Sequence, residues 1–261
     1  MKLSKYCLRT LQLVLATLAP LIFSHCSTGS LISKDRGLPI ATQSAPSEYE
    51  VLLNTYVTPD GVDYTRWSKN TNALQNLRKT THFYASTRPP RDQHKALAWH
   101  LNAYNSWILE QILTQWPNKG PLNVSLLFFH RDAITISGKK MSFQDLEQKI
   151  IRPRYQEPRI HFALNCASRS CPPLHTKPFR AETLSTTLDQ LTENFLNHNP
   201  HAFTVTKHGI QLSKIFKWYE KDFGGCKQLI TYINSYRSSP LSTEAEISFK
   251  NYDWSLNQAP R

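Results

Sequence analysis

Apart from its N-terminal stretch, the sequence lacks any apolar run that approaches the roughly 20 residues of a membrane-spanning helix. It also lacks a detectable internal repeat, and its Lys and Arg residues are scattered and accompany no nucleic-acid-binding motif. Its cysteines and histidines do not have the spacing of the common zinc knuckles. These absences argue against a multi-span membrane protein, a repeat protein, a nucleic-acid binder and a zinc domain, and no cofactor is expected.

Residues 1–26 have the layout of a secretory signal. Lys2, Lys5 and Arg9 give a positive start, and an apolar run over 11–23 follows. That run is too short for a permanent transmembrane helix, and Pro20 interrupts it. We therefore expect an exported protein of the periplasm or cell envelope.

The end of this signal leaves two outcomes open. The sequence Phe23-Ser-His-Cys26 resembles a lipoprotein cleavage site, at which Cys26 would carry a lipid anchor, although His25 replaces the small residue expected there. Ordinary cleavage near Ser27 is the alternative. The formal charge of +12, lowered by three when the signal is removed, can attract anionic lipids or acidic glycans, but a solvated basic surface is the simpler interpretation.

The remaining chain is long enough for one large domain. Residues 27–47 are rich in Ser, Thr, Pro and charge without apolar periodicity, which predicts a flexible linker. The folded domain is expected over 48–258. Helices are predicted over 62–77, 94–115, 143–151, 183–197 and 226–236, and 49–57 is either a helix or a strand. Strands are predicted within 125–137 and over 160–164, 202–206, 209–212 and 246–250.

The segment 94–115 is the expected buried central helix. Its apolar positions surround most of the helix, and Asp92 can accept hydrogen bonds from the first-turn amides. The predicted fold class is α+β, with this helix packed against a small mixed or antiparallel sheet in a single domain. A papain- or transglutaminase-like arrangement is one form that such a domain can take.

Five motifs in a fixed order carry a family resemblance. They cover 98–105, 142–147, 159–173, 212–223 and 252–257. In these motifs the chain resembles the exported bacterial and eukaryotic proteins of the domain of unknown function 547 family, over most of residues 48–257. The resemblance implies a defined domain, and the family name implies no particular reaction.

The third motif places His161 five residues before Cys166 and a second cysteine, Cys171, five residues later. A thiolate beside an imidazole can attack a carbonyl group, so Cys166 is the candidate nucleophile and His161 the candidate base. In an uninterrupted strand the two side chains would point to opposite faces. A bend near Asn165 is therefore required to bring them together.

A structural interpretation of the same cysteines is a disulfide between Cys166 and Cys171. Together with Cys226, they make an odd number in an oxidising compartment, so at least one thiol is left unpaired within the mature chain. A free structural thiol and a pairing with Cys226 also remain open.

A catalytic imidazole needs a third group that orients it, and the candidates are Asn105 and Asp253. Asn102 lies on the same helical face as Asn105 and is a candidate for supporting the site. Alternatively, both amides brace the neighbouring strand and loop. His100 points away from this face and is expected to be structural or exposed.

The leading hypothesis is a thiol-dependent hydrolase or acyl transferase that acts on a peptide or amide bond of the envelope. Cys166 is its nucleophile, His161 its base, and Asn105 or Asp253 the orienting group. The competing hypothesis is a noncatalytic envelope binding or scaffolding domain held by a Cys166–Cys171 disulfide. The oligomeric state does not follow from the sequence.

Overall fold

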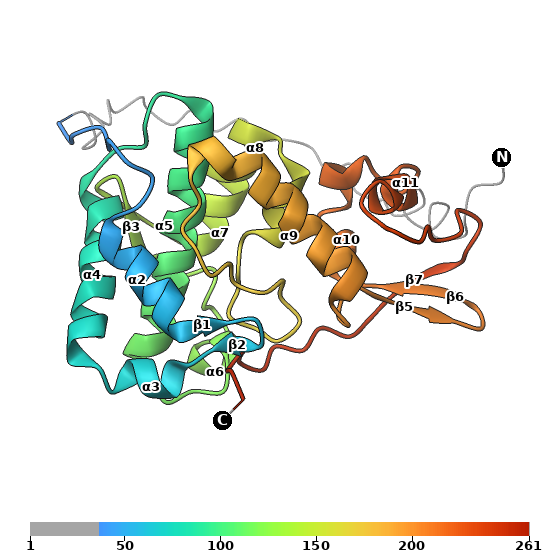
Figure 1. Ribbon diagram of the computed structural model, residues 1–261, viewed down its shortest axis with the longest axis horizontal. Coiled ribbons are helices and arrows are strands. Elements are labelled where there is room, and N and C mark those ends of the chain that lie inside the picture. The colour runs from blue at the N-terminus through green and yellow to red at the C-terminus, as the bar shows by residue number, and fades with distance from the viewer. Residues whose placement is uncertain (1–36, 261) are drawn as a thin grey trace, which may run out of the picture.

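The computed structural model describes residues 37–260, so the predicted export signal and the lipidation site at Cys26 lie outside the described part. The chain folds as an α+β domain with helices at one end and a small sheet at the other (Figure 1). The predicted fold class is thereby confirmed. Within residues 37–260, no helix is both long and apolar enough to cross a membrane.

Helices dominate the first part of the domain. The elements are α2 (Ser47–Tyr56), β1 (Val57–Thr58), β2 (Gly61–Val62), α3 (Tyr64–Ser68), α4 (Thr71–Ser86), α5 (Gln93–Thr114) and α6 (Pro121–Val124). The helix predicted over 62–77 is divided into α3 and α4. Asp63 and Asn70 explain the division, because each side chain accepts a backbone N–H three residues later and begins a new helix.

The middle of the domain alternates short strands and short helices. It contains β3 (Ile134–Ile136), β4 (Lys139–Met141), α7 (Phe143–Asp145), the π-helix η1 (Leu146–Ile151), α8 (Arg152–Tyr155) and the 3₁₀ helix η2 (Pro158–Phe162). Ser142 caps α7 by accepting the N–H of Asp145 at 3.0 Å. Pro153 does not end the helical run, because it lies in the first turn of α8, where its missing N–H costs little.

The strand predicted over 160–164 is wrong. Glu157 caps η2 by accepting the N–H of Arg159 at 3.0 Å, and the carbonyl of Ile160 accepts the N–H of Ala163 at 2.9 Å. These bonds form a tight helical turn over the apolar residues. A short buried apolar run fits a strand and a helical turn equally well, so its pattern alone does not separate the two.

The last part of the domain contains the largest sheet among the described residues. It comprises η3 (Ala181–Thr183), α9 (Leu184–His198), β5 (Phe203–Thr206), β6 (Gly209–Leu212), α10 (Ile215–Trp218), η4 (Glu220–Phe223), α11 (Leu229–Asn234) and β7 (Ile247–Phe249). β6 is the middle strand, antiparallel to β5 and parallel to β7. The predicted hairpin and final strand are confirmed, whereas the helix predicted from Cys226 begins only at Leu229.

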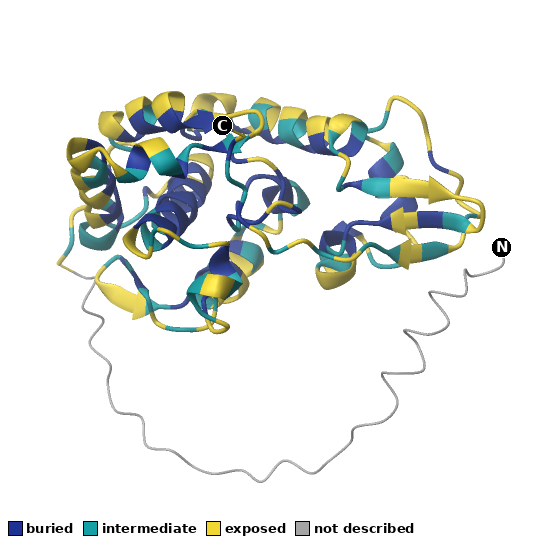
Figure 2. Ribbon diagram, turned by 90° about the horizontal axis from the view of Figure 1, so that it is seen from below, coloured by how far each residue is buried: buried dark blue, intermediate teal, exposed yellow. Residues whose placement is uncertain are grey.

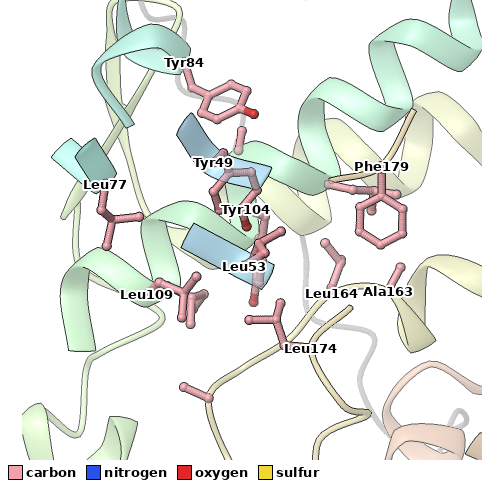
Figure 3. Close-up of a cluster of buried hydrophobic side chains, with 14 of the residues drawn as sticks. Tyr49, Leu53, Leu77, Tyr84, Tyr104, Leu109, Ala163, Leu164, Leu174 and Phe179 are labelled. Atoms are coloured by element: carbon pink, nitrogen blue, oxygen red, sulfur yellow. The ribbon is translucent and has the colours of Figure 1, made fainter. Parts of the chain in front are cut away.

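Helix α5 is the buried centre of the helical end. Asp92 caps it by accepting the N–H of Lys95 at 2.9 Å, and its residues are buried on every side over most of its length (Figure 2). α4 packs along it, and side chains from α2, α4 and the 163–179 segment gather around it (Figure 3). Helices contribute its most extensive contacts, and buried residues of the short β3–β4 sheet, Ile134 and Ile136, belong to the same core.

Two apolar cores explain this arrangement. The first surrounds α5, and the second joins α9 to the β5–β7 sheet and the short helices that follow. The 3₁₀ helix η2 links them, because Ile160 and Ala163 belong to the first core and Phe162 to the second. His161 therefore lies on the segment that connects the two cores.

The segment 39–45, within the predicted linker, packs against the domain. The N–H of Ala41 donates to the carbonyl of Arg88 at 2.8 Å, and the Ser44 hydroxyl donates to the carbonyl of Phe179 at 2.8 Å. Ala41 is itself buried. The folded region thus begins several residues before the boundary drawn from composition.

Candidate functional site

A cavity of about 460 Å³ opens where the two cores meet. Side chains from α5, the π-helix, η2, the 164–172 loop, α10 and the C-terminal segment contribute to it. Its lining residues are Tyr104, Phe129, His130, Gln144, Glu147, Gln148, His161, Leu164, Cys166, Cys171, Pro172, Ile215, Trp218, Tyr219, Tyr252 and Trp254. A cavity with apolar walls and a few polar groups is the usual form of a small-molecule or substrate site.

His161 lies in this cavity and is held on two sides. Its Nε2 is 2.7 Å from Oδ2 of Asp222, and its ring stacks on Tyr219 with the ring centroids 3.8 Å apart. When the neutral ring donates its Nε2 proton to Asp222, Nδ1 carries the free lone pair. The contact with Asp222 therefore favours the tautomer in which Nδ1 can accept a proton.

Asp222 is itself fixed by a second partner. Arg152 donates from Nε to Oδ2 at 2.6 Å and from Nη2 to Oδ1 at 2.7 Å, a two-bond pairing with defined geometry. Burial opposes ionisation of Asp222, but His161 and Arg152 hold the pKa of its carboxyl well below the usual range. The Asp222 carboxylate is therefore negatively charged near neutral pH, where it can orient the imidazole.

The pKa of His161 is lowered from its ordinary value. Burial of the ring is the largest cause, and the hydrogen bond to Asp222 acts in the opposite direction. The imidazole is consequently neutral near pH 7, which is the state required of a general base.

The chain does bend beside the cysteine. The N–H of Ala167 donates to Oδ1 of Asn165 at 2.9 Å, and Ala167 has a φ of 58°, a left-handed conformation that is uncommon for a residue with a side chain. The carbonyl of Ala167 accepts the N–H of Asn257 at 3.1 Å. This turn and its anchor to the C-terminal segment bring Cys166 into the cavity that His161 also lines.

Cys166 is a partly exposed thiol with several hydrogen-bonding partners. Its sulfur is 2.9 Å from the Ser168 hydroxyl and 3.3 Å from the Tyr252 hydroxyl, and the Cys171 thiol also favours its ionised form. Burial raises the pKa of Cys166, but these hydrogen bonds outweigh it and lower the pKa to about 7. About half of the thiol is then ionised near neutral pH. His161 is not one of these partners, although both side chains line the same cavity.

Cys166 and Cys171 are both free thiols in the structure. The predicted disulfide between them is therefore absent, and neither is paired with Cys226. Cys171 is buried and accepts the N–H of Cys166 at 2.9 Å. Burial raises the pKa of Cys171 well above its usual value, so only Cys166 has thiolate character near neutral pH.

A buried carboxyl group lies beside the imidazole. Glu147 lies on the π-helix, and its pKa is coupled to Tyr219, the same residue that stacks on His161. Burial raises the pKa of Glu147. The π-helix is significant here because it also carries the chain into Arg152, and such local widenings of a helix are frequent at functional sites.

Aromatic rings form another wall of the cavity. Tyr252 and Trp254 are 4.6 Å apart between ring centroids, and Trp218 lies 4.8 Å from Tyr252. Trp218 remains 44% exposed despite its size. This wall offers flat apolar surface to a bound molecule beside the thiol.

Asn102 and Asn105 brace the fold. Asn102 donates to the carbonyl of Phe179 at 2.9 Å and accepts its N–H at 2.8 Å. Asn105 donates to the carbonyl of Ala163 at 2.9 Å and accepts the N–H of Asn165 at 2.9 Å. Asn105 therefore holds the two ends of the segment between η2 and Cys166, and its amide contacts backbone instead of the His161 ring.

Asp253 also lies elsewhere than expected. Its carboxylate accepts the N–H and the hydroxyl of Ser255, at 2.9 and 2.6 Å, and stabilises a turn. Asp222 takes the orienting position in place of both Asn105 and Asp253. Its sequence neighbourhood mixes aromatic and charged residues and looked like an ordinary amphipathic surface, and no local spacing linked it to His161.

His100, on the central helix, lies outside the cavity lining. His100 is buried, and its Nδ1 lies 2.7 Å from the carbonyl of Ala96 and 2.9 Å from the Tyr155 hydroxyl, so its role is structural. Within residues 37–260, no three His, Cys, Asp or Glu side chains are grouped closely enough to hold a metal ion.

The fold and the site together define an α+β domain with a thiol, an imidazole and a carboxylate around one cavity. Residues 90–196 match the model of the family described as Protein of unknown function, DUF547, which confirms the family resemblance over that range. The matched range includes α5, the π-helix, His161 and both site cysteines, whereas Asp222 and the aromatic wall follow it. No curated protein and no solved structure matches the chain.

Proposed function

We propose that this protein is a thiol-dependent hydrolase or acyl transferase that acts on peptide or amide bonds, with Cys166 as nucleophile and His161 as base. One observation carries the proposal: the low-pKa thiol and the Asp222-held imidazole line the same cavity. Nothing in a purely structural role requires a charged carboxylate to be fixed by an arginine behind that imidazole.

In the proposed reaction the Cys166 sulfur attacks the carbonyl carbon of the amide, and Nδ1 of His161 accepts the thiol proton. The resulting tetrahedral intermediate collapses when its C–N bond breaks and His161 returns the proton to the departing amine. The acyl group remains on Cys166 as a thioester. Water then releases it as a carboxylic acid, or a second amine accepts it as a new amide.

Asp222 stabilises the protonated imidazole through both proton transfers. Its negative charge lies 2.7 Å from Nε2, and Arg152 keeps it from rotating away. In a Ser-His-Asp triad, replacing the Asp that orients the His by Asn lowers kcat by about 10⁴-fold, so the Asp222–His161 contact is the interaction on which this proposal most depends.

The expected location remains part of the proposal. An exported protein, released or lipid-anchored through Cys26, would meet peptide or amide substrates of the cell envelope. The N-terminal mass of the mature protein tests this point, because a diacylglyceryl group on Cys26 and plain cleavage near Ser27 differ in mass. An intact Met1 would contradict export.

The experiment for the reaction is trapping of the acyl-enzyme. An activated thioester or p-nitrophenyl ester is mixed with the reduced protein, and the modified peptide is identified by mass spectrometry. We expect the acyl group on Cys166 and none on Cys171, with the adduct lost in Cys166→Ser and strongly slowed in His161→Ala. Equal modification of both thiols, or a rate independent of His161, would favour the noncatalytic binding or scaffolding domain.

A further inference from the structure

Two free thiols of different character lie next to each other in the cavity. The Cys171 sulfur accepts the backbone N–H of Cys166 at 2.9 Å, and each thiol shifts the pKa of the other. Cys171 also donates to the carbonyl of Leu164 at 3.7 Å. A thiol that serves only as packing does not need to lie against the reactive sulfur.

We propose that Cys166 and Cys171 form a peroxide-reactive pair, in which Cys166 reduces a hydroperoxide and Cys171 resolves the product into an intramolecular disulfide. In the first step the Cys166 thiolate attacks the outer peroxide oxygen, the O–O bond breaks, and an alcohol or water leaves. Cys166 is then a sulfenic acid. In the second step the Cys171 sulfur attacks the Cys166 sulfur, the S–O bond breaks, and water leaves with the Cys171 proton.

The burial of the two cysteines sets the order of these steps. Both cysteines line the cavity, but Cys166 is partly exposed whereas Cys171 is buried, with only 7% of its surface exposed. Cys166 is therefore the more accessible of the two to peroxide. The ionisation of the two thiols agrees with this order, since a low pKa marks the attacking thiolate and a raised pKa keeps Cys171 protonated until the sulfenic acid forms.

The loop between the cysteines permits the closure. It contains only four residues, and it already places the Cys171 sulfur 2.9 Å from the backbone nitrogen of Cys166. Its backbone is pinned to the C-terminal segment, where Arg169 donates its N–H to the carbonyl of Ser255 at 2.8 Å. Bond formation requires the two sulfurs to approach to about 2.05 Å, which side-chain rotation in a small loop can supply.

This inference rests on the reactivity of the Cys166 thiolate and not on acyl transfer. A disulfide at Cys166 would remove the nucleophile of the proposed hydrolase or transferase, so oxidation would also switch that activity off. A dithiol reductant exchanges with the disulfide and returns both thiols.

The test uses the full chain, reduced and then treated with one equivalent of hydrogen peroxide. Remaining thiols are blocked with N-ethylmaleimide before tryptic digestion without reduction. Cleavage after Arg159, Arg169 and Arg180 places the two cysteines in separate peptides, 160–169 and 170–180. We expect these peptides to be joined, one peroxide to be consumed per crosslink, and dithiothreitol to separate them.

Two variants assign the roles. In Cys171→Ser, peroxide consumption should persist while the crosslink is lost, and dimedone should capture Cys166 as a sulfenic acid. In Cys166→Ser, Cys171 should consume no peroxide. Wild-type Cys166 that stays unoxidised, or that proceeds to sulfinic acid without a crosslink, would overturn the proposal, as would crosslinks only between chains.

Acyl-enzyme trapping on the same reduced samples separates the two proposals. A peroxide-dependent crosslink without acylation would support the peroxide-reactive pair and contradict the hydrolase or acyl transferase. Acylation of Cys166 without a crosslink does the reverse. Loss of acylation on peroxide treatment, followed by recovery with dithiothreitol, is the result expected when both are correct.

Discussion

At the scale of single residues, the surroundings of Cys166 matter more than its identity. Its thiol is stabilised as a thiolate by neighbouring hydroxyl and thiol groups, and none of these contacts is a salt bridge. Ser168 is two residues away, but Tyr252 arrives from the far end of the chain. The reactivity of the thiol therefore depends on a residue that is distant in sequence.

This dependence gives a titration prediction. In Tyr252→Phe the hydroxyl that lies 3.3 Å from the Cys166 sulfur is lost, while the ring is kept. The pKa of Cys166, about 7 in the wild type, should rise toward the ordinary value of about 8.5. Thiolate absorbance at 240 nm as a function of pH measures the shift, and an unchanged midpoint would mean that Tyr252 does not stabilise the thiolate.

Tyr236→Phe supplies the matched control for this titration. Tyr236 also keeps its ring in the variant, and its hydroxyl is not among the hydrogen-bonding partners of either free thiol. The midpoint of the Cys166 titration in Tyr236→Phe should coincide with that of the wild type. Equal shifts in the two variants would point to a general change of the fold.

At the scale of the elements, the site depends on loops and short helices more than on the long central helix. The long elements were predictable: α5, α9 and the β5–β6 hairpin have the apolar periodicity and the caps or turn residues expected of them. The segment around His161 was not, because its five apolar-rich residues fit either a strand or a 3₁₀ turn. The hydrogen bond from the N–H of Arg159 to Glu157 starts the 3₁₀ turn. The spacing of apolar residues carries no information about such a cap.

The catalytic candidates divide in the same way. Cys166 and His161 were found because chemistry-bearing residues lie close together in sequence. Asp222 was missed because 61 residues separate it from His161, and only folding of the second core brings the two together. Asn105 was found as a buried polar residue, but the sequence does not say whether its amide meets a ring or the backbone.

The C-terminal segment is the element whose placement is most constrained. Gly120 has a φ of 140°, and a Cβ there would lie 2.3 Å from the carbonyl oxygen of Trp254. Gly120→Ala should therefore displace this segment and lower the free energy of unfolding by about 1 to 3 kcal/mol, the usual cost of such backbone strain. Urea unfolding followed by circular dichroism measures the change.

Gly37→Ala is the control for the strain argument. A Cβ at Gly37 meets nothing within 4 Å, so the midpoint of urea unfolding should be the same in Gly37→Ala as in the wild type. Equal stability of the two alanine variants would show that the close approach of Gly120 to Trp254 is not a constraint. If only Gly120→Ala loses stability, the displaced C-terminal segment should also shift Trp254 in the aromatic wall of the cavity.

At the scale of the whole molecule, the two cores meet around buried titratable groups. His100 anchors the first core from inside α5, and burial lowers its pKa to about 4. Above about pH 6.5 this ring is neutral in both the folded and the unfolded chain, so it has no effect on stability there. Between about pH 6.5 and 4 the unfolded chain binds a proton that the folded chain does not.

The free energy of unfolding should consequently fall across this window because of His100. A difference of roughly two and a half pKa units corresponds to about 3 kcal/mol at the acid end. Urea unfolding of wild type and His100→Gln at a series of pH values measures the contribution as the difference between their slopes. Parallel curves for the two proteins between pH 6.5 and 4 would contradict the burial argument.

The two-core arrangement also has a functional consequence. The thiol belongs to the loop beside the first core, whereas Asp222 lies on η4, whose Phe223 is part of the second core, so the proposed catalytic set exists only when both cores are folded and joined through η2. The central claim is that Asp222 orients His161, so that His161 can accept the Cys166 proton when the sulfur attacks a carbonyl group. It is this contact, and not the His-to-Cys spacing, that distinguishes an active site from a neighbouring pair of residues.

The most direct measurement is the rate of Cys166 acylation by a thioester probe in wild type, Asp222→Asn and Asp253→Asn, with folding of each checked by circular dichroism. Asp253→Asn is the matched control, since its carboxylate serves only the turn at Ser255. We predict a rate about 10⁴-fold lower in Asp222→Asn and a wild-type rate in Asp253→Asn. A wild-type rate in folded Asp222→Asn, or equal losses in the two variants, would contradict the claim.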